Sequence, residues 1–174
     1  YEGLNAIPPE LFLLPEWLPF HPRRFYCHTR LIYLGLAYIS GKRFIAALPQ
    51  TLVADLRREL YSTPYEKIPF SKLRHKLAPG DVYVPITPVL RLIYDGLALF
   101  ERWHGKKQRE KALRGCLDRI EFEQKTTRHQ GISPVNGLLN TLALFIANPA
   151  HPELEASLAG VAAWRGEDEK EGLR

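Results

Sequence analysis

The sequence contains no methionine, only two cysteines and no long apolar run. Because translation starts at methionine, we expect an internal segment of a longer polypeptide. Cys27 and Cys116 fit no CxxC spacing, so buried or partly buried free thiols are expected rather than a disulfide or a metal pair. No stretch approaches the roughly eighteen apolar residues that a membrane-spanning helix needs, and no signal peptide opens the sequence.

Short catalytic motifs are also missing from the sequence. It holds no HExxH pair, P-loop, glycine-rich dinucleotide loop or GxSxG elbow. His104, His129 and His151 stand alone on expected links, where we predict solvated side chains. Acidic groups near helix ends or in the tail are predicted to be surface charge, namely Glu121 with Glu123 and Glu167 to Glu169.

The charge balance is moderately basic, with 24 Lys and Arg against 19 Asp and Glu and a net charge of +5. The basic residues form separate pairs along the chain instead of one cluster with interleaved aromatic residues, so no nucleic acid partner is expected. Hydrophobic residues make up 45% and charged residues 25%, which is typical of a globular protein. We therefore expect one helical segment over residues 1–165 and a charged, frayed tail over 166–174.

Apolar residues recur at helical spacing along most of the chain, and no strand pattern is convincing. Hydroxyl side chains at residues 51, 71, 87 and 133 are expected to cap helices. Six to eight helices joined by short links predict an all-α array of helical hairpins, without a repeat regular enough for a solenoid. The predicted helices are 9–14, 25–40 (ended by Gly41), 52–61, 72–77, 88–104, 106–123, 134–147 and 152–164, with a turn at 79–81.

The densest group of chemically capable side chains lies between residues 21 and 33. Apolar positions from 31 to 39 are too closely spaced for a one-sided surface helix, so we expect burial on most of the circumference. Tyr26 and Tyr33 are seven positions apart and share a helical face with Thr29. His28 joins Tyr26 in one cavity only if residues 25–28 are extended or the helix starts late. The residues alone favour a satisfied core histidine and leave a chemical role open.

Collinear stretches across nearly the whole chain resemble the oxidosqualene cyclases, the family of lanosterol and cycloartenol synthases. They include the proline-rich run 7–19 and the motif Phe25-Tyr26-Cys27-His28-Thr29-Arg30. The further matching stretches are 21–22, 34–38, 56–61, 64–65, 102–103 with 111–114, 133–136 with 139–140, and 164 with 166–168.

This resemblance implies an all-α array of helical hairpins that is part of an α/α barrel in a two-domain triterpene cyclase. In that family an acid protonates the epoxide of 2,3-oxidosqualene, and a carbocation cascade closes rings in an aromatic-lined cavity. The family motif Trp-Cys-His-Cys-Arg places Tyr26 and His28 on the cavity wall near the late cation. Thr29 and Tyr33 fall at the gate between a membrane-facing entrance channel and the cavity.

Two departures from the family pattern matter. Tyr26 replaces a Trp and offers a weaker cation–π surface, and Thr29 replaces a Cys at the gate, so the product stays open. The Asp-Cys-Thr-Ala motif that supplies the general acid is absent, so the isolated segment is expected to be inactive. The resemblance implies an isomerase, an intramolecular transferase, that needs no metal or organic cofactor.

The implied partners are 2,3-oxidosqualene, one leaflet of a membrane and the remainder of the cyclase chain. The implied location is monotopic, at the endoplasmic reticulum or lipid droplets in a eukaryote and at the inner membrane in a bacterium. One alternative is a helical module that binds membrane or protein peripherally. Another is a segment of a squalene–hopene-type cyclase, although the Cys27-His28 pair favours the oxidosqualene branch.

Overall fold

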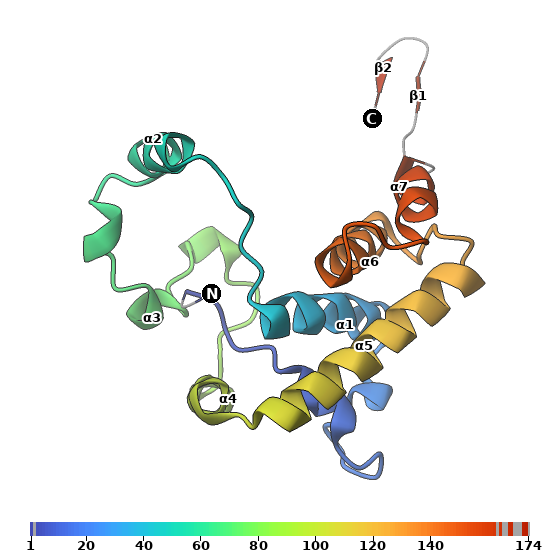
Figure 1. The fold of residues 1–174 in the computed structure, drawn as a ribbon. Helices are drawn as coiled ribbons and strands as arrows, with labels where there is room; N and C mark the ends of the chain where they lie inside the picture. The colour runs from blue at the N-terminus through green and yellow to red at the C-terminus, as the bar shows by residue number, and fades with distance from the viewer. Residues whose placement is uncertain (2, 163, 165–166, 169–171, 174) are drawn as a thin grey trace. The chain divides into compact units, whose positions relative to one another are not determined.

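Helices account for nearly all the regular structure in the computed structural model of the chain (Figure 1). The structure describes residues 1–174 apart from 2, 163, 165–166, 169–171 and 174. The strands among the described residues are the two-residue β1 (Glu167–Asp168) and β2 (Gly172–Leu173), which pair antiparallel. The all-α prediction is therefore confirmed.

The chain divides into two compact units. Unit 1 comprises residues 1–6 and 44–100, and unit 2 comprises residues 7–43 and 101–174. The predicted single segment over 1–165 stays a prediction, and the predicted tail at 166–174 falls mostly outside the described residues. The elements of unit 2 are the 3-10 helices η1 (Pro9–Leu13) and η2 (Pro22–Arg24), then α1 (Cys27–Lys42), α5 (Lys106–Thr126), α6 (Pro134–Ala147), α7 (Leu154–Ala162) and the two strands.

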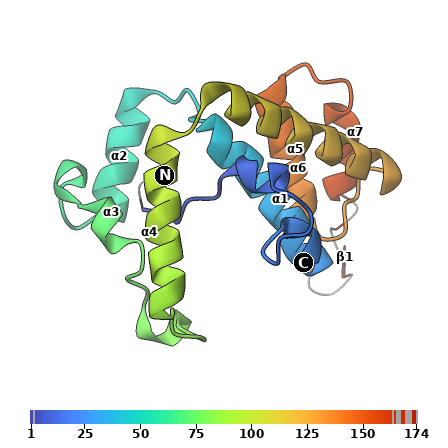
Figure 2. The same ribbon diagram turned by 90° about the horizontal axis from the view of Figure 1, so that it is seen from below.

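The core of unit 2 forms where α1, α5 and α6 pack against one another, with η1 on α5 and α7 on α6 (Figures 1 and 2). Gly35 allows the close approach of α1 and α6, because a β-carbon there would lie 2.8 Å from Cβ of Leu139. No residue from 30 to 41 is exposed, as predicted from the apolar density of this helix. The buried apolar residues of this core are Phe12, Leu34, Ala37, Tyr38, Leu113, Cys116, Ile120, Ala143 and Leu144.

Capping and proline signals located two helix starts correctly. Ser133 Oγ accepts a hydrogen bond of 3.2 Å from the backbone N–H of Asn136, and α6 has the predicted bounds. Thr87 Oγ1 accepts one of 3.2 Å from the N–H of Leu90 at the start of α4 (Pro88–Trp103). Hydroxyl acceptors at these positions satisfy N–H groups that a helix start otherwise leaves unpaired.

The predicted stop of α1 at Gly41 is wrong. The helix continues to Lys42 and ends at Arg43, whose φ of 49° is left-handed. Gly41 lies inside the helix. A β-carbon at this position would lie 2.9 Å from Cγ of Pro9, so the site requires glycine. This glycine therefore permits close packing of η1 instead of ending the helix.

The helices α2 (Gln50–Leu60) and α3 (Phe70–Leu73) of unit 1 each start two residues earlier than predicted, whereas α4 starts at Pro88 as predicted. Unit 1 also contains η3 (Tyr65–Lys67), η4 (Pro79–Asp81) and α4 up to residue 100. Thr51 lies inside α2, which Pro49 precedes, and Ser71 lies inside the four-residue α3. Proline supplies the non-helical residue before both helices, so the predicted hydroxyl caps are wrong. The predicted turn at 79–81 is confirmed as η4.

Two boundaries in unit 2 also differ from the prediction. α5 continues to Thr126, where the hydroxyl groups of Thr126 and Thr127 donate to the carbonyl oxygen of Glu123 at 3.0 and 2.9 Å. Arg128 and His129 then adopt left-handed φ values of 53° and 65°, which reverse the chain. α7 is shorter than predicted, at Leu154–Ala162. None of the described helices combines the length and apolar character needed to cross a bilayer.

Replacing Gly160 with alanine tests how closely α7 packs against the preceding turn. Helix propensity alone favours alanine by about 0.5–1 kcal/mol. However, a β-carbon at Gly160 would lie 2.0 Å from the carbonyl oxygen of His129. We expect Gly160→Ala to destabilise the full-length protein by about 2 kcal/mol, as overpacking does, measured as a lower urea midpoint.

Gly96→Ala in α4 is the matched control, because among the described residues no atom apart from the adjacent backbone of its own helix lies within 4 Å of a β-carbon there. We expect it to stabilise by about 0.5–1 kcal/mol. A comparable gain in Gly160→Ala would contradict the close approach of α7 to His129.

Candidate functional site

Tyr26 and His28 form an aromatic pair at the start of α1. Tyr26 is the N-cap residue, with φ −54° and ψ 141°, so the helix begins at Cys27 instead of the predicted Phe25. This late start is one of the conditions under which the side chains of Tyr26 and His28 can face the same cavity. Their rings stack with centroids 5.2 Å apart and an interplanar angle of 16°. Tyr26 is 70% exposed, so the described residues leave most of its surface open.

The remaining predicted site residues lie in different surroundings. The Tyr33 ring is half-buried and packs edge-on against Phe25, with centroids 5.9 Å apart, and at a tilt against Phe12 at 6.3 Å. Thr29 is exposed on the first turn of α1. The structure thus brings Tyr26 and His28 together but places Tyr33 in a separate aromatic cluster. The chemical roles of all four residues stay predictions.

The two thiols differ in their surroundings. Cys116 is fully buried in the core, and its burial raises the pKa of the thiol to about 12. Cys27 is exposed, which contradicts the predicted burial, and its Sγ lies 3.4 Å from Nδ1 of His28. Both cysteines are free. In the part of the chain that the structure describes, no cluster of three His, Cys, Asp or Glu side chains could hold a metal ion.

Two isolated histidines are not solvated, contrary to prediction. Nε2 of His129 lies 2.6 Å from Oε2 of Glu153, and Nε2 of His151 lies 3.2 Å from Oε1 of Glu121. The hydrogen bond with His129 lowers the pKa of the Glu153 carboxyl. These pairs join α5 and the turn that follows it to the segment that leads into α7. The ring of His104 is partly buried, with Nδ1 3.0 Å from a carbonyl oxygen of α4.

A buried ion-pair network holds η1 against α5. Nε of Arg109 lies 2.6 Å from Oε1 of Glu10, and its Nη2 lies 2.7 Å from Oε1 of Glu101. The Arg109 side chain is almost completely buried. Removing one partner of such a network leaves a buried charge uncompensated, so these residues are expected to be necessary for the position of η1.

Glu123 is the charged residue that the sequence interpretation misplaced. Its side chain is only 7% exposed, and Oε2 accepts from Nδ2 of Asn140 at 3.0 Å and from Nδ2 of Asn136 at 3.5 Å. Burial raises the pKa of this carboxyl, while the two amides act in the opposite direction. A signal was available, because Asn136 and Asn140 are four apart on an otherwise apolar helix and so needed a buried polar partner.

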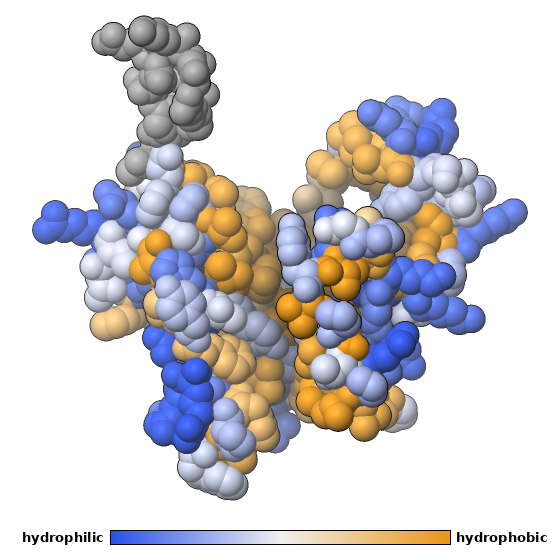
Figure 3. Space-filling model, turned by 180° about the vertical axis from the view of Figure 1, so that it is seen from behind, coloured by the Kyte–Doolittle hydropathy of each residue, from blue (hydrophilic) through white to orange (hydrophobic). Residues whose placement is uncertain are grey.

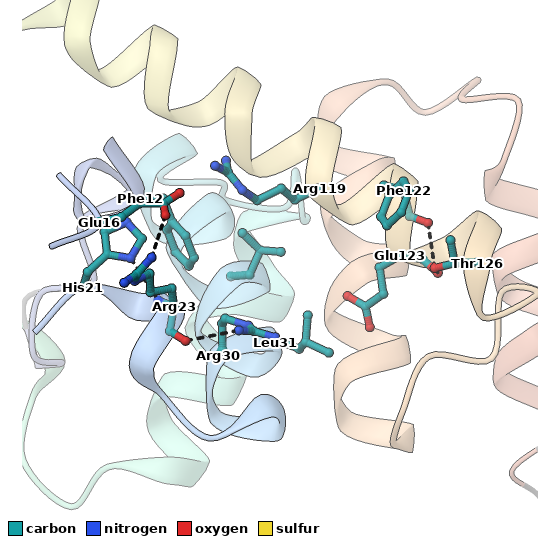
Figure 4. Close-up of a pocket in the computed structure, with 11 residues that line it drawn as sticks. Phe12, Glu16, His21, Arg23, Arg30, Leu31, Arg119, Phe122, Glu123 and Thr126 are labelled. Atoms are coloured by element: carbon teal, nitrogen blue, oxygen red, sulfur yellow. Dashed lines mark hydrogen bonds and ion pairs between the residues drawn. The ribbon is translucent and has the colours of Figure 1, made fainter. Parts of the chain in front are cut away.

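A pocket of about 370 Å³ lies beside Glu123, entirely within unit 2 (Figure 4). Phe12 and Leu34 contribute buried apolar surface, and Phe122 is exposed. Charged side chains reach this pocket from η2, α1, α5 and the segment between η1 and η2. Those charged residues, apart from Glu123, are Glu16, Arg23, Arg30 and Arg119.

The helical hairpins define the chain as an all-α protein, and an exposed aromatic pair lies at the start of its largely buried helix α1. Residues 1–170 match the family model described as the squalene-hopene cyclase N-terminal domain. The chain belongs to this family.

Curated relatives agree with this assignment. The chain is 42% identical over 146 residues to the lanosterol synthase of Pneumocystis carinii, covering 83% of the chain and 20% of that protein. It is 40% identical over 145 residues to the cycloartenol synthase of Dictyostelium discoideum, with 83% and 20% covered. It is 32% identical over 171 residues to the lanosterol synthase of Homo sapiens, with 97% and 23% covered. The predicted resemblance is confirmed, and the chain spans about a fifth of the length of these relatives.

The buried carboxyl of Glu123 gives a prediction about pH. Because its pKa is raised on folding, its contribution to stability is complete below the unfolded value of about 4.3 and is lost as pH rises through the folded value. Glu123→Gln cannot release a proton. In the full-length protein, its urea midpoint should therefore fall less, or rise more, than the parent's between pH 4 and pH 7.

Glu110→Gln serves as the control, because Glu110 is exposed on the same helix. We expect its pH dependence to match the parent. If Glu123→Gln also followed the parent curve, the carboxyl would not be the buried group that carries this pH dependence.

Proposed function

We propose that the whole protein is an oxidosqualene cyclase, an isomerase that converts 2,3-oxidosqualene to a sterol or triterpenoid. This chain would contribute wall to the reaction cavity. The stacked, open pair of Tyr26 and His28, at the position of the family motif, is the observation that carries the proposal. The similarity of the chain to a lanosterol synthase and a cycloartenol synthase supports it. The general acid would come from another part of the polypeptide.

The chemistry of this wall follows from the electron distribution of its rings. An aromatic face carries the negative part of a quadrupole and attracts a cation within about 6 Å of its centroid by about 0.5–2 kcal/mol. His28 stacks on Tyr26 and limits the orientations of that ring. The thiol of Cys27, 3.4 Å from Nδ1, in turn restrains the imidazole. The pair would therefore present a held π-face to a carbocation without consuming a proton.

Thr29 and Tyr33 would form the gate between entrance channel and cavity. The ring of Tyr33 is held by Phe25 and Phe12, so it offers a stationary side to a constriction. Thr29 is small and exposed one helical turn earlier, so it leaves room beside that ring. This asymmetry supports a passage whose width depends on the residue at position 29.

Removing the aromatic wall tests the proposed reaction. In full-length enzyme supplied with 2,3-oxidosqualene, we expect Tyr26→Ala and His28→Ala to lower turnover about 2- to 30-fold or to redistribute products, as loss of a cation–π contact implies. Tyr26→Phe keeps the ring and should stay close to the parent. Turnover and products are measured by gas chromatography with mass spectrometry.

Tyr83→Ala is the matched control, because Tyr83 is a tyrosine of unit 1 that is 90% exposed. Its turnover and products should equal those of the parent. Unchanged rate and products in both Tyr26→Ala and His28→Ala would remove this pair from the mechanism.

We further propose that the protein lies monotopically on one membrane leaflet, at the endoplasmic reticulum or lipid droplets in a eukaryote or the inner membrane in a bacterium. The segment between η1 and η2 exposes Trp17 and Phe20, and the exposed basic residue Arg24 follows in η2. Apolar rings next to basic side chains are suited to the interface of an anionic membrane. Figure 3 shows further apolar side chains at the surface.

Flotation with vesicles containing phosphatidylserine measures this attachment. The full-length double variant Trp17→Glu, Phe20→Glu should lower the bound fraction several-fold, because it places charge where apolar rings would enter the interface. Tyr83→Glu adds an exposed charge outside this segment and should float like the parent. Equal flotation of both variants would argue against attachment through residues 17–20.

Two alternative functions are less well supported. A free-standing binding module does not account for a family match over residues 1–170. A squalene–hopene-type activity is compatible with the description of that family, but the relatives' names favour the oxidosqualene branch. Supplying the full-length enzyme with squalene and, separately, with 2,3-oxidosqualene distinguishes the two activities by which substrate is consumed.

A further inference from the structure

The pocket beside Glu123 contains a carboxylate oxygen that lacks a partner. Oε1 of Glu123 is buried, and within the described part of the chain no donor lies within hydrogen-bond distance of it. Oε2 takes the amide groups of both Asn140 and Asn136. Figure 4 shows the Glu123 carboxylate directed away from α5, into the space beside Leu31 of α1. A buried acceptor of this kind is costly unless a donor satisfies it.

Two guanidinium groups at the same pocket also lack a carboxylate partner among the described residues. Nη1 of Arg119 donates to the carbonyl oxygen of Gly115 at 2.7 Å. Nη1 of Arg30 donates to the carbonyl oxygen of Arg23 at 3.4 Å, which is a weak contact. In contrast, the guanidinium of Arg23 is paired with Glu16 at 2.8 Å, so it is already neutralised. Arg30 and Arg119 are therefore available to an incoming carboxylate.

Besides the arginines and the unpaired oxygen of Glu123, the apolar lining of the pocket sets a third requirement for a ligand. Phe12 is buried, whereas Phe122 is 70% exposed beside the pocket. A matching occupant carries a carboxylate for the arginines, an N–H or O–H group for Oε1 of Glu123 and an apolar group for Phe122. A small free anion meets only the first of these three requirements.

We propose that this pocket binds a segment of the same polypeptide from outside these 174 residues, through an Asp or Glu side chain next to an apolar one. A polypeptide supplies carboxylate, main-chain N–H and apolar side chain within a few residues. Relatives about four times as long as this chain provide ample further sequence. The inference rests on the proposed function only in that a full-length cyclase would supply the segment.

Site-specific photocrosslinking in the full-length protein tests the docking. Phe122 is replaced by p-benzoyl-phenylalanine, the protein is irradiated, and the adduct is mapped by mass spectrometry. We expect a crosslink to a peptide of the same chain, outside residues 1–174, that contains an Asp or Glu. Arg30→Gln with Arg119→Gln should lower its yield about ten-fold, because charge-assisted hydrogen bonds are lost.

Two controls separate docking from general disruption. Arg114→Gln changes an exposed arginine of α5 that does not line the pocket, and it should leave the yield unchanged. The same photoreactive residue in place of the exposed Leu158 of α7 should not capture that peptide. Arg119→Gln alone changes an exposed side chain and gives a second, milder variant, expected to lower the yield in the same direction.

The proposal is overturned by a crosslink to lipid or to another protein, by the absence of an adduct, or by a yield that does not depend on the arginines. Product formation from 2,3-oxidosqualene, measured on the same preparation, separates the two proposals. Turnover without the crosslink rejects the docking alone. The crosslink without turnover supports the docking and rejects the proposed cyclase activity alone.

Discussion

The close contact of α1 with α6 is the constraint on which unit 2 depends. A β-carbon at Gly35 would lie 2.8 Å from Cβ of Leu139 and 3.7 Å from Oδ1 of Asn140. The same turn of α6 therefore meets α1 and carries the amide that binds the buried carboxylate of Glu123 on α5. Apolar fit and polar pairing occur at one crossing, so the three helices have little freedom to shift independently.

This constraint extends to the candidate site through the chain that precedes α1. The pair of Arg109 with Glu10 anchors η1 on α5, and Phe12 of η1 packs against Tyr33 of α1. The segment between η1 and α1 is thus held at both ends and reaches the helix in an extended conformation at Tyr26. The aromatic pair is positioned by packing far from it, as expected for a surface built on a rigid scaffold.

Local signals explain what the sequence predicted well. A serine or threonine followed by proline marked the starts of α4 and α6, and the motif around His28 indicated the family before any coordinates. The failures concern partners distant in sequence. The prediction of a surface position for Glu123 fails because its amide partners lie on another helix, and the prediction of a helix end at Gly41 fails because Pro9 packs on this glycine. The neighbouring sequence does not identify such residues, since only tertiary packing brings their partners near; for Glu123 the one signal, the pair Asn136 and Asn140, lies on another helix.

The late start of α1 has an electrostatic consequence for the proposed cavity. The first N–H groups of this helix have no side-chain cap, so the positive end of its dipole, about half an elementary charge, lies beside the stacked rings. A cation over the ring of Tyr26 would be attracted by the π-face and repelled by the helix terminus. This wall would therefore hold positive charge weakly and briefly, and so favour its onward migration over a long-lived intermediate.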